Sequence, residues 1–165
     1  MSDTIESPTL QKLCIQLYGI YALSAVLQFF EETFLVGLLA LTIAYIIGNS
    51  KKEAAKNTPY ASHLRWMYRT LWIGSLVIIP AGLLIGAVLV FIFTDTSMIT
   101  GTLDNGDPDV AMGGIQGYLA HNMTKITILT TITTIPTAAW WINRCWVGYV
   151  LAKDGKPVEN VTRWR

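Results

Sequence analysis

Residue types that commonly carry chemistry are scarce in this sequence of 165 residues. The candidate metal ligands are the histidines His63 and His121 and the cysteines Cys14 and Cys145, which are not clustered as a metal site requires. The run from Asp104 to Asp109 offers oxygen donors, but it lacks the residue order and the closing glutamate of an EF-hand calcium loop. We therefore expect no metal and no cofactor, and we expect both cysteines to be small buried residues.

Known catalytic arrangements are also missing from the sequence. It contains no HExxH pair, no glycine-rich phosphate loop and no pair of carboxylates within an apolar segment. A lipid-modifying enzyme could use His63 or His121 as a base, but neither histidine has a carboxylate motif nearby. We expect no catalytic residues and a protein that is not an enzyme.

The composition indicates which class of protein must position these residues. Charged residues make up 14% of the chain and hydrophobic residues 52%, whereas a soluble domain has about 25% charged residues. The net charge of +1 argues against a nucleic-acid partner. The chain length fits one domain, and the composition predicts an integral membrane protein.

Long apolar stretches predict the membrane-spanning helices. A helix needs roughly 20 apolar residues to cross the hydrocarbon core, and four regions meet this length. The predicted spans cover about 13–30, 33–49, 71–94 and 123–150, with an outer loop over 95–122. Only Glu31 and Glu32 separate the first two spans, which form either a tight hairpin or one re-entrant unit. The predicted fold class is all-α, an integral membrane four-helix bundle.

Basic residues give the orientation of these spans. Eleven of the twelve lysines and arginines lie before the first span, between the second and third, or at and beyond the inner end of the fourth, and Lys125 is the exception. Because basic loops stay in the cytoplasm, both termini and the loop over 50–70 are predicted to be cytoplasmic.

A cytoplasmic amphipathic helix is predicted over 58–70, at the membrane interface and leading into the third span. Its apolar stripe comprises Tyr60, Leu64, Met67 and Leu71, and its second stripe comprises Ser62, Arg65, Arg69 and Trp72. We interpret the basic residues as ordinary anchors or as a contact with membrane lipids or a protein partner. The candidate contact residues are Ser62, His63, Arg65, Arg69, Trp72 and Arg144. Arg144 lies at the inner end of the fourth span, where its side chain could extend to the interface.

Small and polar residues indicate how the helices pack. A stripe of Gly37, Ala40, Ala44 and Gly48, and the pair Gly82 and Gly86, allow close approach of helices, either within one bundle or at a dimer seam. Pro80 and Pro136 are expected to kink the third and fourth spans. The fourth span also has a threonine-rich polar face, which could pack against another helix or line a polar path. Its candidate residues are Thr127, Thr130, Thr131 and Thr134.

Two motifs resemble a family of small proteobacterial inner-membrane proteins of unknown function. The first runs through Ser62–Trp66 and Arg69–Gly74, and the second through Trp141–Arg144, Gly148 and Asp154–Pro157. The family is distantly similar to the chloroplast import-channel (Tic-type) superfamily, which also has four helices. The resemblance implies a bacterial inner-membrane location and a four-helix fold, but no activity. The long segment over 95–122 departs from the family pattern and suggests an added external contact.

These observations favour a non-catalytic accessory or assembly subunit of a larger membrane complex. Small size, packing stripes and an elaborated outer loop motivate this interpretation. The alternative is a small homo-oligomeric channel or transporter, in which the threonine face of the fourth span lines the path.

Overall fold

A computed structural model describes residues 7–28, 30–103 and 107–159 of the chain. Across these ranges the chain forms helices joined by turns and contains no strand, which confirms the all-α prediction. The predictions that concern Asp104–Gly106, and the basic residues Arg163 and Arg165, lie outside the described residues.

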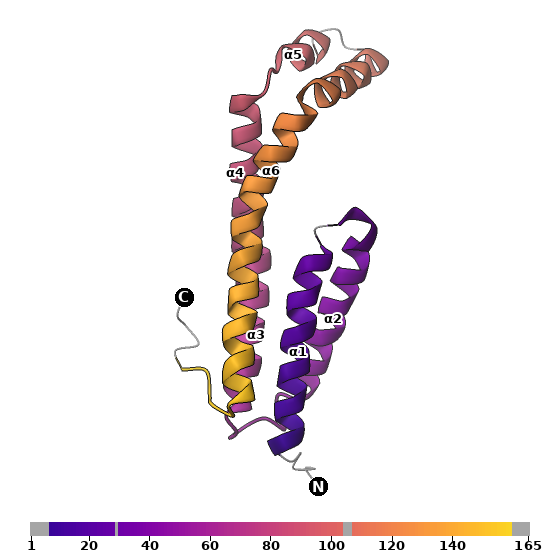
Figure 1. The fold of residues 1–165 in the computed structure, drawn as a ribbon. Helices are drawn as coiled ribbons and strands as arrows, with labels where there is room; N and C mark the ends of the chain where they lie inside the picture. The colour runs from indigo at the N-terminus through magenta and orange to yellow at the C-terminus, as the bar shows by residue number, and fades with distance from the viewer. Residues whose placement is uncertain (1–6, 29, 104–106, 160–165) are drawn as a thin grey trace. The chain divides into compact units, whose positions relative to one another are not determined.

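In the described part of the chain, six α-helices and two short helical turns follow one another (Figure 1). They are α1 (Ser7–Leu27), the 3-10 turn η1 (Glu31–Thr33), α2 (Phe34–Ser50), α3 (Tyr60–Ile73), the π-helical turn η2 (Gly74–Ile78), α4 (Ile79–Phe93), α5 (Ser97–Leu103) and α6 (Pro108–Lys153). The chain divides into two compact units, Met1–Val77 with Ala138–Arg165 (unit 1) and Ile78–Thr137 (unit 2). Helix α6 contributes to both units.

Two helical stretches among the described residues are long and apolar enough to cross a membrane. They are Pro8–Leu27 and Tyr60–Phe93, while Phe34–Ser50 is apolar but shorter. The predicted fourth span, 123–150, lies inside α6 and is not one of these two stretches. Length and composition therefore support membrane-spanning helices in the first and third predicted positions.

In unit 1, helices α1 and α2 form the predicted hairpin around η1 (Figure 1). The hydroxyl of Thr33 donates to the carbonyl oxygen of Leu27 over 2.7 Å and closes the turn. A Cβ atom at Gly37 would lie 3.0 Å from the carbonyl oxygen of Ser24, so this glycine lets the two backbones meet. Gly37, Ala44 and Gly48 are buried within the unit, as intramolecular packing of their stripe predicts.

Helix α3 is predicted to lie at the membrane interface, but its apolar face is covered by protein. Tyr60, Leu64 and Met67 are buried in the core of unit 1, against residues of α1 and α6. The helix then continues through η2 into α4 as one helical stretch. The π-helical turn ends two residues before Pro80, which has no backbone N–H for a regular helical bond. Helix α6 runs through Pro136 without interruption.

In unit 2, two glycines of α4 face two threonines of α6. A Cβ atom at Gly82 would lie 3.2 Å from Oγ1 of Thr137, and one at Gly86 would lie 3.1 Å from Oγ1 of Thr133. The predicted glycine pair is therefore an intramolecular packing surface, and the threonines that it contacts are Thr133 and Thr137.

The predicted outer loop over 95–122 is wrong as a loop, because most of its described residues are helical. Helix α5 covers Ser97–Leu103, and α6 already begins at Pro108. The carboxylate of Asp107 accepts from the backbone N–H of Asp109 over 2.9 Å, as an N-cap does, and Pro108 occupies the first helical position. An acidic residue followed by proline, which resembles a turn in the sequence, here starts a long helix.

Asn122 fixes the turn between α4 and α5. It is fully buried, and its amide bonds the backbone N–H and the carbonyl oxygen of Asp95, each over 3.3 Å. It also donates to the carbonyl oxygen of Tyr118, whose hydroxyl bonds Thr94 over 2.6 Å. The backbone N–H of Ser97 bonds the Asp95 carboxylate and lowers its pKa. The side chain of Asn122 is thus fully used in contacts within unit 2.

Asn122→Ala should destabilise unit 2 by about 1–3 kcal/mol, because the change removes the three hydrogen bonds of a fully buried amide. Thermal unfolding of the detergent-solubilised protein measures this loss. Asn143→Ala is the matched control, since Asn143 lies exposed on the same helix. Equal unfolding temperatures for the two variants would contradict this role of Asn122.

Candidate functional site

The two motifs that carry the family resemblance meet in unit 1, at the contact between α3 and α6. The indole N–H of Trp66 donates to the carbonyl oxygen of Arg144 over 3.1 Å. In return, Nε of Arg144 donates to the hydroxyl of Thr70 over 2.9 Å, and that hydroxyl donates to the carbonyl oxygen of Trp66. Residues far apart in the sequence therefore bind each other through both backbone and side chains.

The guanidinium group of Arg144 lies between aromatic rings. Its central carbon is 3.6 Å from the ring centroid of Trp66 and 5.2 Å from that of Trp140. The side chain is 1% exposed. A cation over an aromatic ring gains about 2 kcal/mol when both are removed from water. The Arg144 side chain therefore turns into the core, which differs from its candidate position as a lipid or partner contact at the interface.

His63, a candidate lipid or partner contact, is also buried and is bonded within the chain. Its Nε2 lies 2.8 Å from the carbonyl oxygen of Lys156, and its Nδ1 lies 3.1 Å from the hydroxyl of Tyr18. A carbonyl oxygen can only accept, so Nε2 carries the proton. In the neutral ring, Nδ1 then accepts from the Tyr18 hydroxyl. His63 thus connects α1, α3 and the segment after α6.

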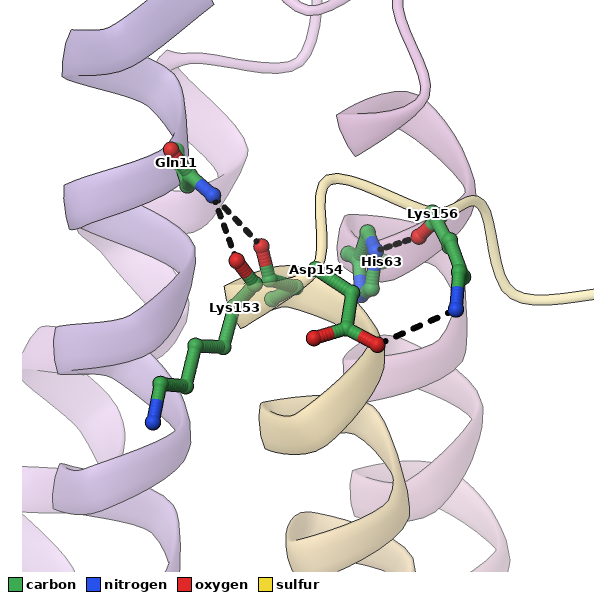
Figure 2. A network of polar contacts seen from close by, with 6 residues as sticks. Gln11, His63, Lys153, Asp154 and Lys156 are labelled. Atoms are coloured by element: carbon green, nitrogen blue, oxygen red, sulfur yellow. Dashed lines mark hydrogen bonds and ion pairs between the residues drawn. The ribbon is translucent and has the colours of Figure 1, made fainter.

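The segment after α6 folds back through a glycine turn. The N–H of Gly155 bonds the carbonyl oxygen of Ala152, and that of Lys156 bonds Leu151, which is the Schellman pattern. Gly155 has a φ of +68°, a conformation that favours glycine. This turn brings the carbonyl oxygen of Lys156 to His63 (Figure 2).

Two further contacts hold this C-terminal segment. The backbone N–H of Val158 donates to the hydroxyl of Ser62 over 2.9 Å. From α1, the amide of Gln11 donates to the carbonyl oxygens of Ala152 and Lys153, over 3.0 and 2.9 Å (Figure 2). Ser62 therefore binds the protein's own chain, which is a different partner from the predicted lipid or protein.

The other predicted contact residues face outward from α3. Arg65 is exposed, Trp72 is 54% exposed, and Arg69 is half-buried. The Nε atom of Arg69 is enclosed and has no hydrogen-bond partner among the described residues. Of the predicted contact residues, these three remain reachable from outside.

The predicted polar face of α6 is exposed in unit 2, but its hydroxyl groups bond to their own helix. The hydroxyls of Thr130, Thr131 and Thr134 donate to the carbonyl oxygens four residues earlier, over 2.8, 2.7 and 2.6 Å. Thr127 is exposed and supplies the carbonyl oxygen for Thr131. Such bonds satisfy the donors and leave the hydroxyl oxygens as acceptors.

Sequence reasoning missed the face of α6 that packs in unit 1. Gly148 lies against the ring of Tyr18, Trp141 lies against Gly74, and the indole N–H of Trp141 donates to the carbonyl oxygen of Tyr21 over 3.2 Å. A helical spacing was available as a signal, because the buried residues of this part of α6 recur every three or four positions. They are Trp141, Arg144, Cys145, Gly148 and Ala152.

Cys14 and Cys145 are both buried and unbonded, as predicted for small core residues. Within the described ranges, no group of three histidine, cysteine, aspartate or glutamate side chains could hold a metal ion.

Comparisons with protein-family models, curated proteins and solved structures find no match to this chain.

Proposed function

We propose that this protein is a non-catalytic, four-span protein of the bacterial inner membrane that serves as an accessory or assembly subunit of a larger membrane complex. One observation carries the proposal. The buried polar side chains of unit 1 bind backbone groups of neighbouring segments, as His63 binds Lys156, Trp66 binds Arg144 and Trp141 binds Tyr21. Polar side chains that bond the backbone of another segment hold the helices in place and are not left free for catalysis.

The outward surfaces of the helices support a membrane location. On α4, Leu83, Leu84 and Phe91 are each 69–71% exposed, and on α2 Leu35 and Leu39 are 67% and 62% exposed. Water would make such surfaces prone to association, whereas lipid chains or the apolar face of a partner helix would cover them. The resemblance of the α3 and α6 motifs to proteobacterial inner-membrane proteins supports the bacterial assignment.

Purification from the native membrane tests this function. The tagged protein is extracted in mild detergent, sized under native conditions and analysed by mass spectrometry, beside an unrelated multi-pass protein with the same tag. We expect a larger protein to co-purify in fixed stoichiometry with this chain and to be missing from the control. Recovery of this chain alone would contradict the subunit proposal.

The exposed threonines of α6 favour one alternative, a homo-oligomeric channel. Hydroxyl oxygens with satisfied donors can still accept from water or coordinate a cation. A lone homo-oligomer in the native sizing, followed by liposome flux that Thr131→Leu and Thr134→Leu abolish, would establish this alternative. Unchanged flux in these variants would contradict it.

The proposed orientation predicts the result of a reporter experiment. A reporter that is active in the cytoplasm should work when fused after Arg165, and one that is active outside should work when inserted near Asn105, because basic loops remain cytoplasmic. The control exchanges the two reporters. Activity in the exchanged positions would overturn the orientation.

A further inference from the structure

Two arginines of α3 form an outward-facing cationic pair. Arg65 and Arg69 are one helical turn apart, at positions whose Cβ atoms are about 5–6 Å apart in a helix. Neither side chain forms an ion pair or a hydrogen bond with another residue in the part of the chain that the structure describes. The ion pairs of that part are Lys56 with Glu53 and Lys156 with Asp154.

Arg69 differs from an ordinary solvated surface cation. Its Nε atom is enclosed by protein, so water does not reach this donor in the isolated chain, and no described residue supplies an acceptor for it. An enclosed donor without a partner is unfavourable. The terminal nitrogen atoms of Arg69 are not among the enclosed atoms, so an acceptor outside the described chain can reach them.

A second arginine, Arg144, lies near Arg69. The buried guanidinium of Arg144 lies close enough for the charges of the two arginines to oppose each other. An anion beside Arg69 would reduce this repulsion, and Arg65 could bind the same anion from the preceding turn. Guanidinium groups suit phosphate because their planar N–H donors match its oxygen atoms.

We propose that Arg65 and Arg69 bind the phosphate group of an anionic ligand at the outer face of α3. The lipid form of this ligand rests on the proposed membrane location, which puts α3 at the cytoplasmic interface. The exposed Trp72 lies on the same stripe, and tryptophan prefers the level of the lipid headgroups. A soluble phosphate compound supplies the same chemistry, so the two sources must be separated by experiment.

Native mass spectrometry of the full-length protein, released from detergent micelles, tests the site. The probes are phosphatidylglycerol, phosphatidylcholine and inorganic phosphate. We expect the wild-type protein to retain phosphatidylglycerol in preference to phosphatidylcholine, and Arg69→Gln to lower the bound fraction about tenfold. Arg65→Gln should weaken binding less, because Arg65 is exposed and water screens its charge, whereas Arg69 is half-buried.

Lys52→Gln is the matched control, since it removes the same charge from an exposed position before α3. It should bind phosphatidylglycerol as the wild type does. Equal losses for Arg69→Gln and Lys52→Gln, or unchanged binding in Arg69→Gln, would overturn the site. Circular dichroism of each variant establishes that the helices remain folded.

Competition identifies the source of the phosphate. Displacement of the lipid by inorganic phosphate supports the site and assigns a soluble ligand, whereas retention of the lipid supports the site and assigns a headgroup. The result also separates this inference from the proposed function. A protein that stays monodisperse without detergent contradicts the membrane proposal, while a detergent-dependent protein that is indifferent to all three probes contradicts the phosphate site alone.

Discussion

Gly148→Ala should destabilise unit 1 by roughly 1–3 kcal/mol, although alanine normally favours a helix by about 1 kcal/mol over glycine. A Cβ atom at this position would lie 2.2–2.4 Å from atoms of the Tyr18 ring and its hydroxyl oxygen. The ring cannot move freely, because Tyr18 is buried and its hydroxyl bonds His63. The substitution must therefore separate α6 from α1 or break this hydrogen bond.

Thermal unfolding in detergent measures the effect, with Gly113→Ala as the matched control. Gly113 lies on the same helix, and no atom within 4 Å would meet its added Cβ. The control should leave the midpoint unchanged or raise it. Tyr18→Leu in the Gly148→Ala background should recover part of the loss, because the colliding ring is gone. Equal midpoints for the two alanine variants would contradict the close contact.

His63→Ala should release the segment after α6 and destabilise unit 1 by roughly 2–4 kcal/mol. The change removes two buried hydrogen bonds, at about 1 kcal/mol each, and leaves a cavity where the ring was. The Tyr18 hydroxyl loses its partner, and the Lys156 carbonyl oxygen is no longer held. Trypsin should then cleave faster after Lys153, at the start of the freed turn.

His121→Ala gives the matched control for His63→Ala, because His121 is exposed and carries the same substitution. Its cleavage rate and unfolding temperature should equal those of the wild type. Ser62→Ala, which removes the bond to Val158, should have a smaller effect in the same direction. If His63→Ala is cut no faster than His121→Ala, the histidine does not hold this segment.

Local patterns allowed much of the fold to be predicted. The all-α class, the hairpin of α1 and α2 and the packing stripe of α2 follow from apolar length and from small residues at helical spacing. These features depend on residues near one another in the chain, such as Gly37, Ala44 and Gly48. The start of α6 was missed because Asp107 and Pro108 suit a turn and a helix N-terminus equally well.

The roles of His63 and Arg144 could not be predicted from local patterns. Each resembles an interfacial polar residue in sequence, and each is buried because a distant segment supplies its partner. His63 bonds a carbonyl oxygen 93 positions later, and the backbone of Arg144 accepts from Trp66 across 78 positions. The spacing of polar residues within one helix carries no information about such partners.

Unit 1 combines the first and last parts of the chain, so the order of synthesis decides when its core can form. The ribosome completes α1, α2 and α3 long before it makes the residues that finish their core, because Trp141, Arg144, Gly148 and Lys156 come from the last part of the chain. Until then the Thr70 hydroxyl, the His63 ring and the Tyr21 carbonyl lack these native partners. Unit 1 therefore closes only after translation of α6, and a chain truncated before Ala138 would present an unfinished core to the cell's quality-control proteases.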